Sequence, residues 1–208
     1  MNIPVVYEDD YLVVVDKPSG LLSIPTPKNE PRTLISVLNN DLKEKGAAYR
    51  LHPCHRLDKE TSGLMVLAKG KSVQQAMMEE FRQRRVKKTY SAFVHGKVLS
   101  ASGEIKFPIE GKAAVTKYKV NIRKSAFSAV EAEPFTGRTN QIRIHFKSIG
   151  HPVVGDTRFA FRKDFTLKAK RLCLHARKLE FFHPRTGKKI NLVSELPDYL
   201  SDFLNNHG

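Results

Sequence analysis

Short stretches of apolar residues, separated by polar turns, recur along most of the chain and predict strands. Residues 3–7 and 11–15 are rich in valine and tyrosine and flank the acidic triplet Glu8-Asp9-Asp10, which is typical of a hairpin. The second strand runs into Asp16-Lys17-Pro18-Ser19-Gly20, where proline fixes φ and glycine permits a positive φ. We therefore expect a hairpin that is followed by a tight turn.

Four other stretches show the helical apolar period. In the first, Leu34, Val37, Leu38 and Leu42 fall on one face. The end signals are Thr33 and Gly46 for this helix, a Ser72/Gln75 capping box for the second, Thr139 and Gly150 for the third, and Pro197 for the fourth. These positions predict four amphipathic helices.

Further strands are predicted at residues 64–68, 89–95, 115–122, 126–133, 171–182 and 190–193. The chain shows no repeat and no linker long enough to separate domains, so we expect residues 1–208 to form a single domain. Strands in hairpins, interrupted by single helices, indicate an α+β fold with a mixed, mostly antiparallel sheet and flanking helices. A parallel βαβ fold is the less favoured reading.

One polar stretch does not fit a purely structural explanation. Residues 55–63 (HRLDKETSG) are mostly polar or charged, yet they lead directly into the apolar run 64–68. A strand that enters a core is expected to bring apolar residues at this point. The stretch therefore suggests a functional site.

Charge and cysteine usage narrow the class of protein. With 208 residues, 40% of them apolar, the chain can bury its own core, and its net charge of +15 favours a polyanionic partner such as nucleic acid. A cationic protein at a membrane surface would have the same balance, but no run of 18 apolar residues and no signal peptide is present. Two cysteines are too few for a disulfide framework, so we expect a cytoplasmic protein.

Asp58 is the first candidate for chemistry. A carboxylate before a strand can be a nucleophile or a general base, or it can simply bond local backbone N–H groups in a turn. A second cluster, residues 137–143 (GRTNQIR), holds Arg143, which could pair with Asp58 and keep it ionised. The alternative is that Arg143 is a solvated charge on a short helix.

Tyr90 and two basic segments are the next candidates. Tyr90 follows Lys87 and Lys88 in a predicted strand, so it either packs in the sheet or stacks on a base beside a phosphate site.

Basic residues are also dense between positions 158 and 178, where Phe159, Phe161 and Phe165 are interleaved. We interpret that segment as a loop that contacts phosphates.

A metal site is not expected. His52, Cys54 and His55 lie close together, but no second pair of ligands follows them. His145, His151, His175 and His183 are scattered, one to a segment, and are interpreted as structural. Asp58 and Glu60 are only two residues apart in the same stretch, and we do not expect them to form the facing carboxylates of a glycosidase.

Taken together, these motifs resemble the RluA-type pseudouridine synthase family. The resemblance rests on residues 15–20 (VDKPSG), 55–58 (HRLD), 61–63 (TSG), 88–90 (KTY), 137–145 (GRTNQIRIH), 150–156 (GHPVVGD), 174–176 (LHA) and 183–184 (HP). The motifs occur in family order over nearly the whole chain. The family fold is a mixed, mostly antiparallel sheet with a central RNA-binding cleft, which agrees with the strand pattern.

The resemblance implies roles for individual residues. Asp58 would be the catalytic aspartate, Arg143 its partner, and Tyr90 a ring that stacks on the uracil and takes part in removing the C5 proton. Arg56 would enter the RNA stack to help hold a flipped nucleotide. The residues implied to bind RNA are Arg56, His55, Arg85, Lys87, Lys88, Arg138, Asn140 and Gln141. Neither a cofactor nor a metal is implied, because isomerisation involves no redox change or added atom.

Two departures from the family pattern affect these expectations. Asn140 stands where many relatives have histidine, which leaves its own role open. The small N-terminal RNA-binding domain of some relatives is expected to be absent, so RNA choice would come from loops at 22–32, 81–88 and 156–171.

The resulting hypothesis is a cofactor-independent enzyme that isomerises uridine in rRNA or tRNA. Its partner would be structured RNA, with no membrane and no metal, and we expect a monomer. The alternative is a non-catalytic RNA-binding or ribosome-assembly module on the same fold. A nucleoside-releasing hydrolase is a third hypothesis.

Overall fold

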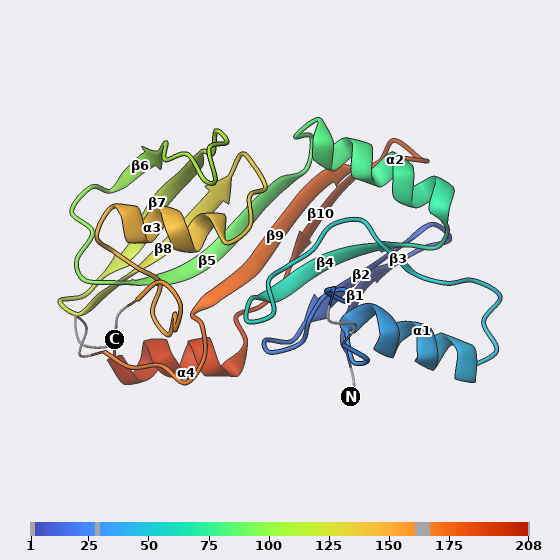
Figure 1. Ribbon diagram of the computed structural model, residues 1–208, viewed down its shortest axis with the longest axis horizontal. Helices are drawn as coiled ribbons and strands as arrows, with labels where there is room; N and C mark the ends of the chain where they lie inside the picture. The colour runs from blue at the N-terminus through green and yellow to red at the C-terminus, as the bar shows by residue number, and fades with distance from the viewer. Residues whose placement is uncertain (1–2, 28–29, 161–166, 208) are drawn as a thin grey trace. The chain divides into compact units, whose positions relative to one another are not determined.

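The computed structural model describes residues 3–27, 30–160 and 167–207 (Figure 1). The chain divides into two compact units, one formed by residues 1–87 with 178–194 and the other by residues 88–177 with 195–208. We describe each unit by itself. That the whole chain acts as a single domain stays a prediction.

The first unit is built on antiparallel strands. Strand β2 (Leu12–Lys17) pairs with β1 (Val5–Glu8) on one side and with β4 (Ser62–Ala68) on the other, as Figure 1 shows. The two-residue strand β3 (His52–Pro53) also pairs with β4, and β10 (Lys189–Val193) pairs with β9 (Leu174–Phe182). The N-terminal hairpin is therefore confirmed.

Strand β4 lies at the centre of this unit, and all seven of its residues are buried. A strand that is covered on both faces should read as a continuous apolar run, as residues 64–68 do. Val14 and Val66 face each other in the register and share a core cluster with Val73 and Met77 of helix α2 (Lys71–Arg82). This packing fixes where β4 begins, and with it the polar stretch just before it.

Two of the predicted helix starts are wrong. Helix α1 (Leu34–Glu44) does begin after Thr33, whose hydroxyl accepts a hydrogen bond from the backbone N–H of Ser36. Helix α2, in contrast, has Gly70 at its N-cap, with φ 132° and no capping side chain, instead of Ser72. Helix α3 (Gln141–Ser148) begins after Asn140 in a left-handed conformation, instead of after Thr139. Glycine and asparagine are the residues that tolerate positive φ, so backbone geometry decided these starts.

In the described part of the second unit, the strands between residues 87 and 134 pair with one another in antiparallel fashion. Strand β8 (Phe127–Pro134) pairs with β5 (Lys87–His95) and with β7 (Thr116–Arg123), which also pairs with β6 (Ser102–Ile105). On the outer face, Lys117 lies opposite Glu133 and Lys119 opposite Glu131. In these cross-strand pairs, each lysine of β7 lies opposite a glutamate of β8, which offsets its charge.

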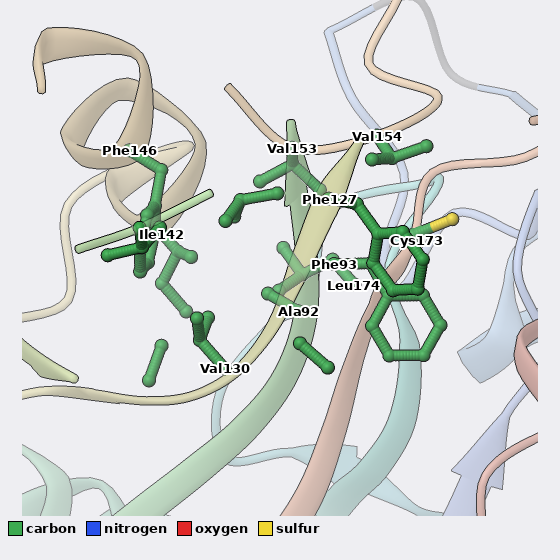
Figure 2. Packing of buried hydrophobic residues seen from close by; sticks show 14 of the residues in the cluster. Ala92, Phe93, Phe127, Val130, Ile142, Phe146, Val153, Val154, Cys173 and Leu174 are labelled. Atoms are coloured by element: carbon green, nitrogen blue, oxygen red, sulfur yellow. The ribbon is translucent and has the colours of Figure 1, made fainter. Parts of the chain in front are cut away.

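Helices α3 and α4 (Asp198–His207) complete the second unit. Figure 2 shows Ile142 and Phe146 of α3 pointing into a cluster that includes Phe93, Phe127 and Val130. Phe203 of α4 joins the same cluster and lies within 5.6 Å of the Phe93 ring, centroid to centroid. The apolar residues of α3 thus pack in the core. The polar residues of this helix lie at other positions around it.

The α+β prediction is confirmed, since the described residues contain four helices and a mixed, mostly antiparallel sheet. The sequence pattern missed β3 and β6, which are too short to show a period. It also began the long C-terminal strand three residues early, at Arg171 instead of Leu174. Within the described ranges, every helix is too short or too polar to cross a lipid bilayer.

Candidate functional site

Asp58 lies half-buried in the loop between β3 and β4, the stretch that the sequence singled out. Its backbone carbonyl accepts a hydrogen bond from the N–H of Thr61 at 3.1 Å, which closes a four-residue turn. Leu57, directly before it, is 4% exposed and anchors the loop in the interior. Asp58 is therefore presented by a turn whose two ends are both held.

The segment that follows β2 holds this turn from the side. The Ser23 hydroxyl both donates to the Leu57 carbonyl (2.7 Å) and accepts from the Leu57 N–H (3.1 Å). The Ser19 hydroxyl donates to the carbonyl of Glu60 at 2.7 Å, and the N–H of Gly20 donates to the carbonyl of Lys59 at 2.8 Å. The two family motifs at 15–20 and 55–63 thus form one structural unit.

Lys17 is a functional candidate that the sequence interpretation missed. Its side chain is 0% exposed, and Nζ donates to the carbonyls of Pro18 (2.9 Å), Leu21 (2.7 Å) and Lys59 (3.2 Å). Burial lowers the pKa of Lys17 to about 8, while the neighbouring charges of Asp58 and Asp16 act in the opposite direction. The sequence does show Lys17 at the end of an apolar strand, which could have indicated its burial, but we interpreted it only as part of the turn at residues 16–20.

His55 has a role inside the protein. Its Nε2 accepts a hydrogen bond from the N–H of Val66 at 3.0 Å, and its ring packs on Phe81 with centroids 4.5 Å apart. Accepting at Nε2 requires the neutral tautomer that is protonated at Nδ1. Arg56, the next residue, is exposed, and its contact with RNA stays a prediction. We therefore keep Arg56 among the RNA contacts proposed below and leave His55 out.

Arg143 lies on α3 and is 4% exposed, so it is not a solvated surface charge. It forms a bidentate ion pair with Asp156, in which Nε donates to Oδ2 at 2.7 Å and Nη2 donates to Oδ1 at 2.8 Å. Its Nη1 also donates to Oδ1 of Asn140 at 2.9 Å. That Arg143 pairs with Asp58 stays a prediction.

Asp156 was not singled out from the sequence, although it ends the motif at 150–156. Its Oδ1 also accepts hydrogen bonds from the N–H groups of Arg158 and Phe159, each at 2.9 Å. Burial would raise the pKa of this carboxyl, but the bonds from Arg143 and the two amides hold it below the usual value. Asp156 is therefore an ionised carboxylate inside the protein.

Gln141 is buried and fully engaged in bonds that hold the start of α3. Its Oε1 accepts from the Thr136 hydroxyl (2.6 Å) and the Arg138 N–H (3.0 Å). Its Nε2 donates to the carbonyl of Val115 (2.9 Å) and to the Thr116 hydroxyl (3.0 Å). These bonds give Gln141 a structural role, so we leave it out of the RNA contacts proposed below.

Tyr90 and Lys88 lie two residues apart on β5, so their side chains point to the same face of the strand. Both are partly buried, and burial lowers the pKa of Lys88. On the preceding turn, Arg85 forms a bidentate pair with Glu80, and Lys87 lies 3.8 Å from Glu180. The acidic side chains therefore balance part of the basic cluster that the sequence presents.

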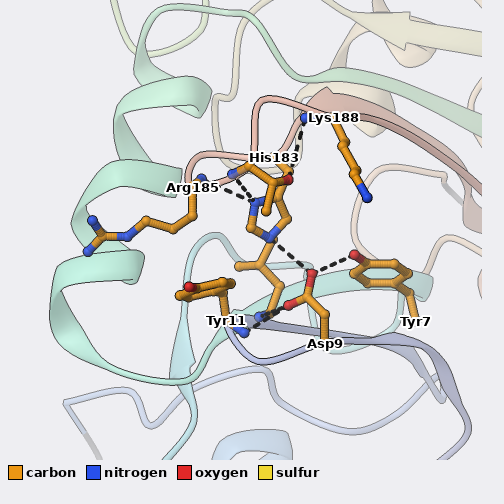
Figure 3. Close-up of polar contacts among 8 residues, drawn as sticks. Tyr7, Asp9, Tyr11, His183, Arg185 and Lys188 are labelled. Carbon is orange, nitrogen blue, oxygen red and sulfur yellow. Dashed lines mark hydrogen bonds and ion pairs between the residues drawn. The ribbon is translucent and has the colours of Figure 1, made fainter.

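His183 supports the structural interpretation of the scattered histidines. Figure 3 shows its ring between Asp9 of the N-terminal hairpin and the turn that carries Arg185. Nδ1 accepts hydrogen bonds from the backbone N–H groups of Arg185 (3.1 Å) and Thr186 (3.0 Å), and Nε2 lies 3.0 Å from Oδ2 of Asp9. The ring thus ties two distant turns together.

Parts of the predicted phosphate-contacting segment lie outside the described residues, among them Phe161, Arg162, Lys163 and Phe165. Arg158 and Phe159 are described, and the Arg158 guanidinium lies 5.2 Å from the centre of the Phe159 ring. Across the described part of the chain, no group of three or more His, Cys, Asp or Glu side chains is arranged to hold a metal ion.

The family model described as RNA pseudouridylate synthase matches residues 11–148, a range that includes Asp58, Tyr90 and Arg143. The chain belongs to this family. The resemblance noted from the sequence motifs is therefore confirmed, and the protein is an RNA pseudouridine synthase, an isomerase.

Relatives of the synthase cover almost its whole length. An uncharacterized RNA pseudouridine synthase of Bacillus subtilis, YlyB, is 34% identical over 99% of this chain and 73% of the relative. The dual-specificity RNA pseudouridine synthase RluA of Haemophilus influenzae is 38% identical over 89% of this chain and 90% of the relative. The solved structure of human RNA pseudouridylate synthase domain containing 4 is 28% identical, with a TM-score of 0.84, over 97% of this chain and 92% of that one.

Proposed function

We propose that the synthase isomerises uridine to pseudouridine in structured rRNA or tRNA, with Asp58 as the catalytic carboxylate. The observation that carries the proposal is the half-buried Asp58, held in a turn by Lys17, Ser19 and Ser23 in a chain of this family. Such a support keeps a nucleophile in a single orientation. The dual-specificity name of the RluA relative supports action on more than one RNA. A relative from Nitrosomonas europaea, 35% identical over 97% of this chain and 64% of its own length, is named ribosomal large subunit pseudouridine synthase D, which supports rRNA as a substrate.

The reaction balances without any added group. The bond between N1 of the base and C1′ of the ribose breaks, the base rotates, and a bond forms between C5 and C1′. One proton leaves C5 and one is gained at N1, so no redox cofactor is required. We propose that Asp58 initiates these steps, with Arg143 as its partner, and that Tyr90 stacks on the uracil and helps remove the C5 proton.

RNA would be held mainly by charge. We propose contacts from Arg56, Arg85, Lys87, Lys88 and Arg138, whose side chains are exposed or half-buried. Asn140 is left out because its side chain accepts a hydrogen bond from Arg143. The net charge of +15 supports such contacts, because each phosphate neutralised by a lysine or arginine releases counterions. We further propose that the protein has an RNA-binding cleft and that it is a monomer. Light scattering would test the monomeric state.

Tritium release tests the proposal directly. RNA that carries tritium at uridine C5 is incubated with the synthase, using tRNA and rRNA pools separately, and the tritium released to water is counted. We expect release from at least one pool and none with Asp58→Asn, which should still bind RNA. Absence of release from both pools would overturn the proposal and favour a non-catalytic RNA-binding or ribosome-assembly module. Abasic RNA as the product would identify a hydrolase instead.

A further inference from the structure

The guanidinium of Arg143 is held by Asp156 and Asn140, two residues of the motifs at 150–156 and 137–145 to which the resemblance assigned no part in the reaction. Asp156 engages Nε and Nη2 through two nearly equal bonds of 2.7 and 2.8 Å, and Asn140 engages Nη1 at 2.9 Å. All three guanidinium nitrogens therefore have a partner within the second unit. A bidentate carboxylate sets the plane of the guanidinium, and a third contact stops rotation within that plane.

The surroundings of this ion pair make it rigid. The Asp156 side chain is 0% exposed and that of Arg143 is 5% exposed, so solvent screening is weak. Asp156 also accepts the N–H groups of Arg158 and Phe159, and the Phe159 ring centre lies 5.1 Å from the Arg143 guanidinium carbon. One carboxylate thus orients the arginine and also shapes the loop whose aromatic ring packs against it.

Asn140 combines a left-handed backbone with a side chain that bonds Arg143. It takes φ 55° and ψ 24° at the N-cap of α3, yet its side chain makes no capping bond to the helix. The side chain instead accepts a hydrogen bond from Arg143, one turn later. Arg143 requires a hydrogen-bond acceptor at position 140, and the amide oxygen of Asn140 supplies one. An asparagine can therefore occupy a position where many relatives have histidine.

We propose that Asp156 and Asn140 are positioning residues that together fix the orientation of the Arg143 guanidinium for the isomerisation. Because Asp156 holds Nε and Nη2 and Asn140 holds Nη1, the arginine serves as an oriented hydrogen-bond donor. The proposal rests on the proposed function, since it assigns Arg143 to the reaction. It adds residues whose effect is on turnover and not on RNA binding.

The kinetic test uses paired substitutions. Asp156→Asn keeps an acceptor for the loop amides but loses the charge and the bidentate geometry, and we expect kcat to fall on the order of 10²-fold. Asn140→Gly keeps the left-handed backbone and removes only the acceptor, so it should lower kcat less, by about tenfold. Asn140→Asp, which restores an acceptor, should recover most of that loss. The control is Thr139→Ala, an exposed neighbour.

RNA affinity separates positioning from binding. The dissociation constant, measured by filter binding with an Asp58→Asn background to prevent turnover, should change less than about twofold in Asp156→Asn and Asn140→Gly. A loss of affinity that accounts for the whole activity loss would overturn the positioning role. So would unchanged kcat in both variants. Asn140→Gly keeps the question answerable if Asp156→Asn does not fold.

A second readout does not depend on activity. In a protein labelled with ¹⁵N-arginine, the Nε–H signal of Arg143, assigned by its loss in Arg143→Lys, should be protected from exchange with water. It should lose this protection in Asp156→Asn, whereas Thr139→Ala should keep it. A signal that exchanges fast in the parent protein would overturn the proposal. If protection is seen but the parent protein releases no tritium from any RNA, the proposed function fails while the clamp on Arg143 stands.

Discussion

Ser23 and Leu57 bond each other in both directions, with the serine hydroxyl donating to the leucine carbonyl and accepting from the leucine N–H. The two residues are 34 positions apart, and both are buried. The contact lies one residue before Asp58. A single hydroxyl thus satisfies both backbone groups at the base of the proposed catalytic turn.

The substitution Ser23→Ala is expected to lower both stability and turnover. It leaves the buried N–H and C=O of Leu57 without their partner, which costs about 1 to 3 kcal/mol for a buried group left unsatisfied. Urea unfolding should show the loss of stability, and tritium release should show a lower kcat because the turn is less firmly held. Ser100→Ala, at an exposed serine, is the control. Unchanged stability and turnover in Ser23→Ala would show that the turn is held by its other bonds.

We expect the activity to decrease at alkaline pH because Lys17 loses its proton there; we call this decrease the basic limb of the pH profile. Its pKa is lowered to about 8, chiefly by burial, so raising the pH through this value removes a cation close to Asp58. We expect kcat to fall above about pH 8 in the parent protein. The variant Lys17→Met should be slower at pH 7 and should lack this limb. The measurement is single-turnover tritium release between pH 6 and about 9.

Stability should change in the opposite direction, which separates the two effects. The folded-state pKa of Lys17 lies below the ordinary value of 10.5, so between these values the unfolded chain binds more protons than the folded protein. The contribution of Lys17 to the free energy of unfolding therefore becomes more favourable as the pH rises from about 8.

A kcat that falls above about pH 8 while the protein stays folded indicates that the loss of the Lys17 charge, and not unfolding, is responsible. A limb that persists in Lys17→Met but disappears in Lys88→Met would assign it to Lys88, whose pKa is also lowered by burial.

Asp9 is expected to stabilise the first unit at neutral pH. It accepts hydrogen bonds from the Tyr7 hydroxyl (2.5 Å) and the N–H groups of Tyr11 (2.8 Å) and Leu12 (2.7 Å). Burial opposes ionisation, but these bonds and the nearby His183 lower the pKa of Asp9 below 3.8. Asp9→Asn should cost about 1 to 3 kcal/mol at pH 7, measured by urea unfolding.

The pH dependence of that loss has a definite sign. Because the folded pKa of Asp9 is lowered, its stabilisation is present above pH 3.8 and is lost as the pH falls through the folded value. The difference between Asp9→Asn and the parent should therefore shrink at acid pH. Asp10→Asn, at the exposed neighbouring carboxylate, should have little effect at either pH. A difference that stayed constant with pH would mean that geometry, and not ionisation, is responsible.

Arg56 is expected to matter most when the target uridine is stacked in folded RNA. Its side chain is exposed two residues before Asp58, and flipping a base out of a helix costs a few kcal/mol. Arg56→Ala should therefore reduce kcat/KM more on a stem-loop than on an unstructured oligonucleotide with the same target sequence. Lys59→Ala, an exposed cation of the same loop, is the matched control. Equal losses on the two substrates would argue against a role in flipping.

Hydrophobic period alone predicted most of the elements of the fold. The apolar run 64–68 became the fully buried β4, and the face of Leu34, Val37 and Leu38 became α1 with Thr33 as its cap. The same reasoning failed at Ser72 and Thr139, because both helices instead begin after residues with positive φ. Local side-chain signals compete with backbone geometry, and that geometry depends on the packing that surrounds it.

The sequence by itself determined the family, the α+β fold and the polar loop around Asp58, because each is written in local spacing or in motifs of adjacent residues. Only the tertiary structure decided that Lys17 is buried beside that loop, that His55 and Gln141 have internal partners, and that Asp156 clamps Arg143. These contacts join side chains to groups 11 to 42 positions away. Burial and hydrogen-bond partners at such separations depend on how the strands and helices pack, so no periodic pattern in the sequence predicts them.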